Sequence, residues 1–231
     1  MSKLNKPFIT DPFANPFLGY PFSEKSSSHR GNATTISETR KSYLDTLLKE
    51  RIVRIEGSAS QTKKIYTELV EVVNHDHELF HKVVTLITRR AKFLLIKPLS
   101  VNVEASVIHS QTDNYLIELQ LVKNPYLHLL ERPDSRIEIG TTDIHSHLVH
   151  ELGHITKPPP LFDTRQAASG IWKTSEEERV ITRIENHCLR QRGKFTRIMY
   201  NAIDCKEDDY EKMSLADKNN FLFYPWGRCN F

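Results

Sequence analysis

The stretch DIHSHLVHELGHIT, residues 143–156, predicts one helix that carries the pattern HExxH in its C-terminal half. Residues four positions apart lie on one face of a helix, so the imidazoles of His150 and His154 can reach a single metal ion. Glu151 stands between them in sequence and can hold a water molecule bound to that ion. Gly153 has no side chain, which we expect to leave room beside the ion. The spacing therefore predicts a metal centre on this helix.

The pattern HExxH occurs a second time, as HELFH at residues 77–81. A metal centre of this type takes a third protein ligand from elsewhere in the fold, so the surroundings must distinguish the two copies. Lysines and apolar residues follow His81, and the nearest acid downstream is Glu104, in a stretch that alternates like a strand. We therefore expect His77 and His81 to line the solvated edge of a helix, and the metal centre to form at residues 150–154.

A run of acidic residues opens the last long helix that the pattern predicts, at about residues 176–192. Glu177 shares a helix face with apolar side chains, and a carboxylate on such a face is costly unless it is paired or binds a metal ion. Glu177 is therefore the predicted third ligand. The simpler alternative is that the acidic run complements the positive end of the helix dipole. The apolar residues on the face of Glu177 are Ile181, Ile184 and Cys188.

Two further carboxylates remain open as ligands. Glu178 is the reserve, because it shares a face with Thr182 and Glu185 that looks more solvated. Asp163 would suit an aspartate-type centre, but it lies in a predicted loop without supporting residues. Ser175 and Glu178 also have the spacing of a capping box, which predicts Ser175 as the N-cap of the last helix.

The hydrophobic pattern predicts an α+β domain over residues 37–231. We expect helices first, with Ser37 as the N-cap of the first one, then short strands, then the HExxH helix and a last helix that Gly193 ends. A small sheet would thus precede the HExxH helix, in a zincin-like metalloprotease domain. The predicted helices are 37–52, 62–73, 76–90, 143–156 and 176–192, and the predicted strands are 93–96, 101–103, 115–122 and 136–139.

The first 36 residues differ from the rest of the chain. Pro-Phe recurs four times before residue 23, and a polar stretch rich in Ser and Thr follows. Each proline blocks a helix and removes a backbone donor, so residues 1–36 are predicted to be disordered. Asp11-Pro12-Phe13 and Asn15-Pro16-Phe17 resemble short ligands of endocytic adaptors, and packing of this segment on the domain is the alternative.

Composition narrows the classes of function. The formal net charge is +3 with Lys and Arg spread along the chain, which argues against nucleic acid as a partner. No apolar run approaches the roughly 20 residues of a membrane helix, and residues 1–20 contain no apolar stretch that would suit a secretory signal peptide. The three cysteines predict free thiols in a reducing compartment rather than a disulfide framework. They are Cys188, Cys205 and Cys229.

The chain resembles a known family over roughly residues 78–200. The pattern in question is an HExxH helix, an acidic pair, then Glu-Asn, Arg, Gly, Arg and Tyr at characteristic spacing. It resembles the NleD-like effector proteases, zinc metalloproteases delivered by bacterial type III secretion, which have relatives in the toxin ends of Rhs proteins. The chain departs from the family in the short Pro-rich loop before Glu177 and in the Pro-Phe repeats. The matching residues are Glu177, Glu178, Glu185, Asn186, Arg190, Gly193, Arg197 and Tyr200.

The resemblance implies a zinc-dependent endopeptidase, secreted into the host cell cytoplasm, that cleaves a host signalling protein such as a stress-activated MAP kinase. The polar start of the chain would suit a type III export signal, and we expect a monomer. Arg197 and Tyr200 would stabilise the developing negative charge or position the substrate. Alternatively, Tyr200 caps the core and Arg197 pairs with Glu185. The rival functions are an antibacterial toxin protease and a non-catalytic adaptor that binds a host trafficking protein through the Pro-Phe motifs.

Overall fold

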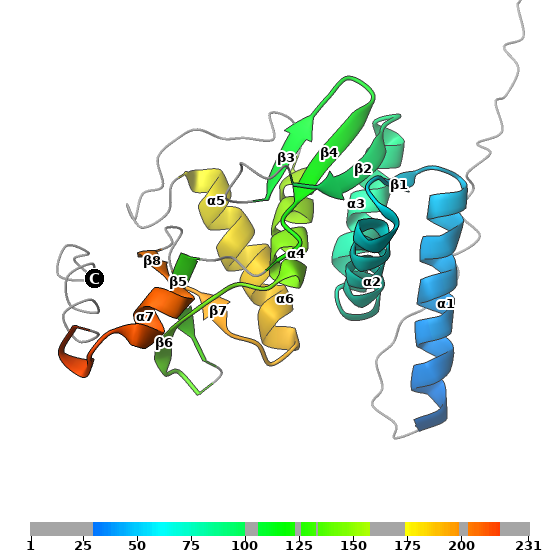
Figure 1. The fold of residues 1–231 in the computed structure, drawn as a ribbon. Coiled ribbons are helices and arrows are strands. Elements are labelled where there is room, and N and C mark those ends of the chain that lie inside the picture. The colour runs from blue at the N-terminus through cyan, green and yellow to red at the C-terminus, as the bar shows by residue number, and fades with distance from the viewer. Residues whose placement is uncertain are drawn as a thin grey trace, which may run out of the picture.

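The computed structural model describes residues 30–99, 106–122, 126–132, 134–157, 174–198 and 203–217. Helices and strands are mixed in an α+β arrangement (Figure 1). The helices are α1 (Arg30–Lys49), α2 (Ala59–His75), α3 (His77–Arg89), α4 (Ile144–Ile155), α5 (Ser175–Val180), the π-helical turn η1 (Ile181–Glu185), α6 (Asn186–Gln191) and α7 (Glu207–Lys212). The strands are β1 (Val53–Ile55), β2 (Phe93–Pro98), β3 (Val107–Ser110), β4 (Asn114–Leu119), β5 (Tyr126–Glu131), β6 (Ile137–Gly140), β7 (Thr196–Arg197) and β8 (Ile203–Lys206).

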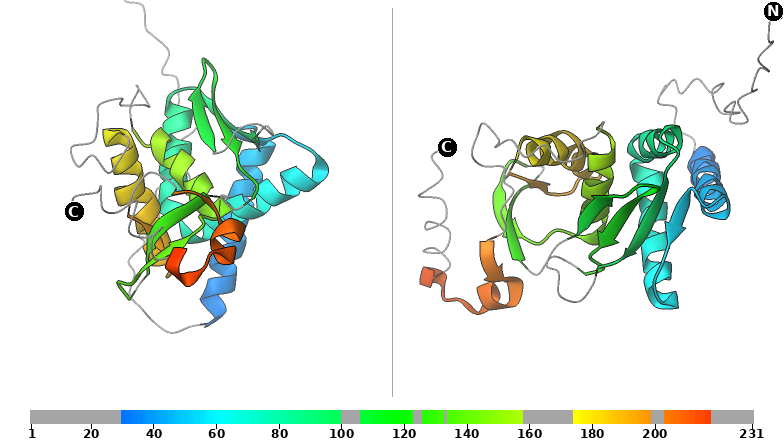
Figure 2. Two further views of the ribbon diagram at one scale, coloured as in Figure 1. Left: turned by 60° about the vertical axis from the view of Figure 1, so that its left-hand side comes forward. Right: turned by 90° about the horizontal axis from the view of Figure 1, so that it is seen from above.

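The strands form two groups around α4. In the first sheet the order is β1-β2-β4-β3, with β1, β2 and β4 parallel and β3 antiparallel at the edge. In the second, β5 pairs with β6, β7 and β8, all antiparallel. The first sheet lies toward α2 and α3, and the second lies toward α6 and α7 (Figures 1 and 2). The helix α4 therefore lies where the two halves of the molecule meet.

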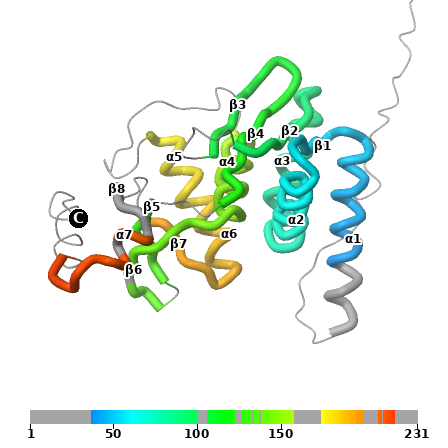
Figure 3. Tube along the Cα trace, viewed as in Figure 1, coloured from blue at the N-terminus to red at the C-terminus, as the bar shows by residue number. Residues whose placement is uncertain are grey.

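The helix α4 is packed on two sides, which fixes the positions of its polar side chains. It packs against α2, α3, β3 and β4 on one side and against α5 and η1 on the other, an arrangement that can be followed along the trace in Figure 3. Leu148 and Leu152 are fully buried in the main core. Since these residues face the first sheet, the opposite side of α4 is turned toward the helix that runs from α5 through η1 to α6.

Most of the expected helices are confirmed. The ranges 62–73, 76–90, 143–156 and 176–192 correspond to α2, α3, α4 and the continuous helical run α5-η1-α6. A capping box of Ser58 and Gln61 starts α2, and Asp143 caps α4 by accepting a hydrogen bond from the Ser146 N–H at 2.8 Å. Gly193 follows the last helix with φ of +63°, a backbone conformation that glycine adopts without strain.

Two of the expected N-caps, Ser37 and Ser175, are wrong. The helix α1 begins at Arg30, so Ser37 lies inside it; the Ser37 hydroxyl instead contacts Asn74 Oδ1 at 3.3 Å, in the packing of α1 on α2. The helix α1 thus crosses the expected boundary between residues 36 and 37. The last helix is capped by Thr174, whose hydroxyl accepts a hydrogen bond from the Glu177 N–H at 3.2 Å, and Ser175 is its first helical residue.

The strand predictions at 93–96, 115–122 and 136–139 are confirmed as β2, β4 and β6, with β4 ending at Leu119. The strand β4 is buried along almost its whole length, because it lies between β2 and β3 and is covered by α4. The strand expected at 101–103 lies outside the described residues, as do the Pro-Phe segment, Asp163 and Tyr200. Within the described ranges, no helix is long and apolar enough to cross a membrane.

Candidate metal centre

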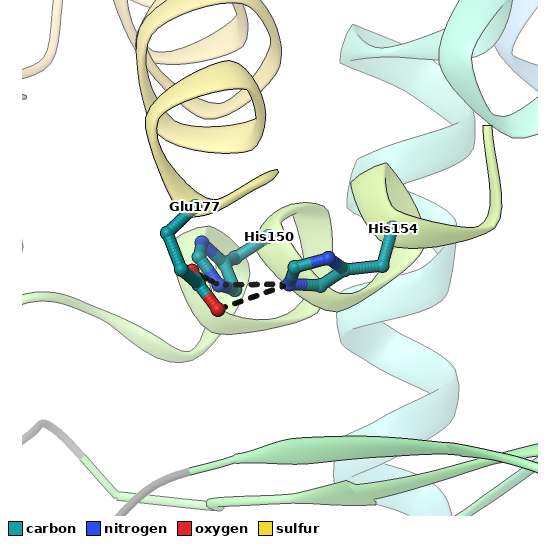
Figure 4. Close-up of side chains that lie close together, drawn as sticks. All are labelled: His150, His154 and Glu177. Atoms are coloured by element: carbon teal, nitrogen blue, oxygen red, sulfur yellow. Dashed lines mark hydrogen bonds and ion pairs between the residues drawn. The ribbon is translucent and has the colours of Figure 1, made fainter. Parts of the chain in front are cut away.

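Three side chains predicted as metal ligands converge between α4 and α5. The Nε2 atoms of His150 and His154 lie 3.3 Å apart, and the Glu177 carboxylate lies 3.2 Å from the first and 3.8 Å from the second (Figure 4). One ligand atom from each residue lies within 4.8 Å of the other two, so the group could hold a metal ion. Ligands bound tetrahedrally at about 2.1 Å are separated by about 3.4 Å. The spacing observed is therefore close to what a small divalent cation requires.

The outer nitrogen of each histidine contacts a buried carboxylate. His150 Nδ1 lies 2.9 Å from Glu185 Oε2, and His154 Nδ1 lies 3.3 Å from Glu176 Oε1. Both glutamate side chains are 1% exposed. A carboxylate that accepts the Nδ1 proton fixes the imidazole with its Nε2 lone pair toward the ion, which is the usual support for a metal-binding histidine.

Basic side chains hold these two carboxylates in place. Arg179 Nη2 and Lys157 Nζ contact Glu176 at 2.6 and 3.2 Å, and Arg197 Nη1 contacts Glu185 at 3.3 Å. Arg179 also donates to the Gly153 carbonyl at 3.1 Å, which ties α5 to α4. The charges of Glu176 and Glu185 are thus compensated by protein side chains before any ion binds.

The π turn η1 explains why Glu185 reaches the metal face. In an uninterrupted α-helix, Glu177 and Glu185 would point about 80° apart. A π turn adds one residue, which reduces this angle to about 20° and puts both carboxylates on the same side. The expectation that Glu185 shares a solvated face with Glu178 is therefore wrong for Glu185. Glu178 is partly exposed and does not belong to the metal-capable group.

Arg197 lies outside the ligand cluster, in contact with Glu185. This is the alternative pairing considered from the sequence. Its backbone N–H and carbonyl are both bonded to the Asn186 side chain, at 2.8 and 2.7 Å, so that the amide of Asn186 holds β7 against the helix. Glu185 thus connects Arg197 to His150, and Asn186 holds the backbone of Arg197. The sequence did not indicate the connection to His150.

The absence of a side chain at Gly153 serves helix packing. A Cβ at this position would lie 2.9 Å from Val180 Cγ1 and 3.4 Å from Ile184 Cγ2. The expectation that Gly153 leaves room beside the ion is therefore wrong, because side chains of the last helix occupy this space. The close approach of the last helix to α4 brings Glu177 near His150 and His154.

The other histidines of α4 have structural partners. His145 Nε2 lies 2.7 Å from Asp76 Oδ2, and both residues are buried, so this pair ties the start of α4 to the junction between α2 and α3. His147 Nε2 lies 2.7 Å from the Thr142 hydroxyl. Burial lowers the pKa of His147 to about 4, which keeps its ring neutral.

The first HExxH copy lies on α3, away from this group. The rings of His77 and His81 stack at 6.1 Å between centroids, and both contact the ring of Tyr43. His81 is exposed, as expected, whereas His77 is half-buried. Among the residues that the structure describes, neither belongs to a metal-capable group.

The titratable groups of the centre shift each other's pKa values. Burial opposes a charge on His150, but hydrogen bonds to Glu177 and Glu185 outweigh it and raise the pKa of His150 to about 10. Burial likewise opposes ionisation of Glu185, yet Arg197 and His150 lower its pKa to about 2. Burial raises the pKa of Glu151, which is 5% exposed. The metal-free centre is therefore protonated on His150 at neutral pH.

Metal binding is expected to displace this proton. Since the pKa of His150 is raised, its proton competes with the ion at every pH below about 10, and the affinity for Zn²⁺ should fall as the pH falls. At pH 7 we expect release of about one proton per ion bound. Calorimetric titration in two buffers of different ionisation enthalpy measures this number. Binding without proton release would contradict the assignment of His150 as a ligand.

Glu185→Gln is expected to lower the affinity for Zn²⁺ about 10- to 100-fold, because a neutral amide holds the His150 ring less firmly than a carboxylate does. Competition with a chelating dye measures the change. Glu71→Gln is the matched control: Glu71 contacts His75 at 3.2 Å in an exposed pair on α2, and its loss should leave the affinity unchanged. Equal effects of the two substitutions would show that Glu185 has no special role.

Comparison with known proteins does not add a relative: the chain matches no protein-family model, and no match was found among the curated proteins or the solved structures. The assignment of a function therefore depends on the geometry of this centre and on the motif resemblance.

Proposed function

We propose that this protein is a zinc-dependent endopeptidase with a zincin-like domain. The observation that carries the proposal is the convergence of the Nε2 atoms of His150 and His154 on the Glu177 carboxylate, with both Nδ1 atoms held by buried carboxylates. Two imidazoles and one carboxylate form a donor set typical of catalytic zinc, in which water takes the fourth position.

The residues around this position suit hydrolysis of a peptide bond. Bound zinc would supply a Lewis acid that lowers the pKa of a water molecule to about 7. Glu151 follows His150 in the sequence and is 5% exposed. It takes the proton of the attacking water and later gives it to the leaving amine, as a general base and then a general acid. Glu176, Glu185 and their basic partners keep the two imidazoles oriented throughout.

Four motif residues of the resemblance to the NleD-like effector proteases lie at or beside the metal centre. Glu177 belongs to the ligand cluster, Glu185 supports His150, and Asn186 and Arg197 are joined to Glu185. These four residues of the motif are thus connected to one another around one centre. From the resemblance we propose further that the peptidase is a type III effector that acts in the host cytoplasm on a signalling protein, with stress-activated MAP kinases as the first candidates.

The test is N-terminal proteomics of host-cell lysate. The lysate is treated with the zinc-loaded full chain or with the same preparation of Glu151→Gln. Peptides with new N-termini should appear with the wild type alone and disappear when a chelator is added. Absence of any such peptide would contradict the proposal, and cleavage confined to a parallel bacterial lysate would favour the antibacterial toxin. An effect on host cells that Glu151→Gln retains would favour the adaptor.

A further inference from the structure

A basic pocket lies at the far end of the last helix from the metal centre. It has a volume of about 310 Å³ and lies between the β5–β6 hairpin and the residues that follow α6. Three of its six lining residues are cationic and one is anionic. They are Glu131, Arg132, Ser135, Arg190, Lys194 and Thr196.

Two of the three cations are left without an ion pair among the described residues. Arg190 and Lys194 are exposed, and neither forms an ion pair within the described part of the chain. Arg132 pairs with Glu138, and its guanidinium lies over the Phe195 ring at 5.1 Å to the centroid. Its Nε is nevertheless buried and has no hydrogen-bond partner in the described ranges. The pocket therefore offers unused donors and unbalanced positive charge.

The last carbonyl groups of the helix do not need these cations as hydrogen-bond donors. Basic residues at a helix C-terminus often serve the last carbonyl groups. Here backbone donors already do so: the Gly193 N–H bonds to the Arg190 carbonyl and the Lys194 N–H to the Leu189 carbonyl, both at 2.9 Å. The side chains are thus free to meet a ligand.

The backbone of the hairpin supports the same conclusion. Ser135 lines the pocket, and its backbone has φ of +62°. Residues other than glycine rarely adopt this left-handed conformation. Such strain persists where the surroundings hold it, and it is frequent at binding sites. The turn is held by hydrogen bonds from the Ser135 N–H to the Arg132 carbonyl at 3.0 Å and from the Arg132 N–H to the Arg136 carbonyl at 2.7 Å.

The pocket lies within reach of a polypeptide bound at the metal centre. At about 1.5 Å per helical residue, Arg190 lies about 20 Å along the helix from Glu177. An extended peptide of about six residues covers this distance. The strand β7 also joins the two places, since Thr196 lines the pocket and the next residue, Arg197, contacts Glu185.

We propose that this pocket binds an anionic group, a carboxylate or a phosphoryl group, in an acidic segment of the protein substrate, away from the scissile bond. Guanidinium and ammonium groups recognise both kinds of oxyanion through charge-assisted hydrogen bonds. The proposal rests on the proposed peptidase function and adds a substrate class to it: proteins with an acidic or phosphorylated surface segment. Binding at this site selects the substrate and leaves the chemical step to the metal centre.

The experiment titrates the zinc-loaded full chain with hexaglutamate and, separately, with inorganic phosphate, by calorimetry. Binding should weaken about tenfold between about 50 and 500 mM NaCl, because exposed charges are screened. Lys194→Glu and Arg190→Glu should each weaken binding about tenfold or more. Lys63→Glu, an equal change of charge at an exposed position of α2, is the control and should bind like the wild type. Phosphate binding without hexaglutamate binding would assign the pocket to phosphorylated segments.

Cleavage gives a second readout. With a substrate protein found by proteomics, Lys194→Glu should raise KM about tenfold with kcat unchanged, the signature of binding that does not act on the transition state. Equal losses in Lys63→Glu and Lys194→Glu, no binding of either probe, or preference for RNA or anionic vesicles over hexaglutamate would each overturn the proposal. Hexaglutamate binding by a chain that cleaves nothing would contradict the peptidase and leave the anion site standing.

Discussion

His154→Ala is expected to reduce the zinc content of the purified protein from about one ion per chain to almost none. His154 is 2% exposed, its Nε2 faces the ligand cluster and its Nδ1 contacts Glu176. Without it, one imidazole and one carboxylate remain, fewer than the three protein ligands that a catalytic zinc site uses. Elemental mass spectrometry after dialysis measures the change.

The chain contains its own control for this substitution. His81 occupies the same position in the other HExxH copy, is exposed and belongs to no metal-capable group within the described ranges. His81→Ala should therefore keep its zinc. His154→Gln, which fills more of the space, separates loss of the ligand from loss of packing, and circular dichroism of each variant checks the fold. Full zinc content in a folded His154→Ala protein would contradict the metal centre.

Glu151→Gln is expected to lower the cleavage rate by about 10²- to 10⁴-fold, the range for loss of a general base, while zinc stays bound. The amide has nearly the shape of the carboxylate but cannot accept a proton from water. Since Glu151 is not one of the three ligand residues, the zinc content should not change. The measurement combines kcat/KM on a cleaved protein with metal analysis of the same preparation.

Glu78→Gln is the matched control for this second prediction, because Glu78 holds the same place in the copy at residues 77–81 and is exposed on α3. It should cleave like the wild type. A Glu151→Gln protein that loses zinc as well as activity would give Glu151 a structural role. Unchanged cleavage would exclude it as the base and with it the proposed mechanism.

The helices could be predicted from the sequence because their signals are local. The apolar periodicity of α2, α3, α4 and the last helix is strong, and Asp143 and Gly193 mark two of their ends. The short strands β1, β3, β5, β7 and β8 were not predicted. Each has two to six residues, and such strands owe their form to partners that are distant in the sequence.

The sequence alone determined that His150, Glu151 and His154 share one turn of helix, since the helical period places residues four apart on one face. It also marked Glu177 as a carboxylate on an apolar face. The surroundings in the sequence also favoured the HExxH copy at residues 150–154, which the structure brings to the acidic helix. Only the tertiary structure decided that Glu185 and Glu176 support the two imidazoles. The π turn at 181–185 and the close helix contact at Gly153 produce this arrangement. Both depend on the packing of residues far apart in the chain, which local periodicity does not encode.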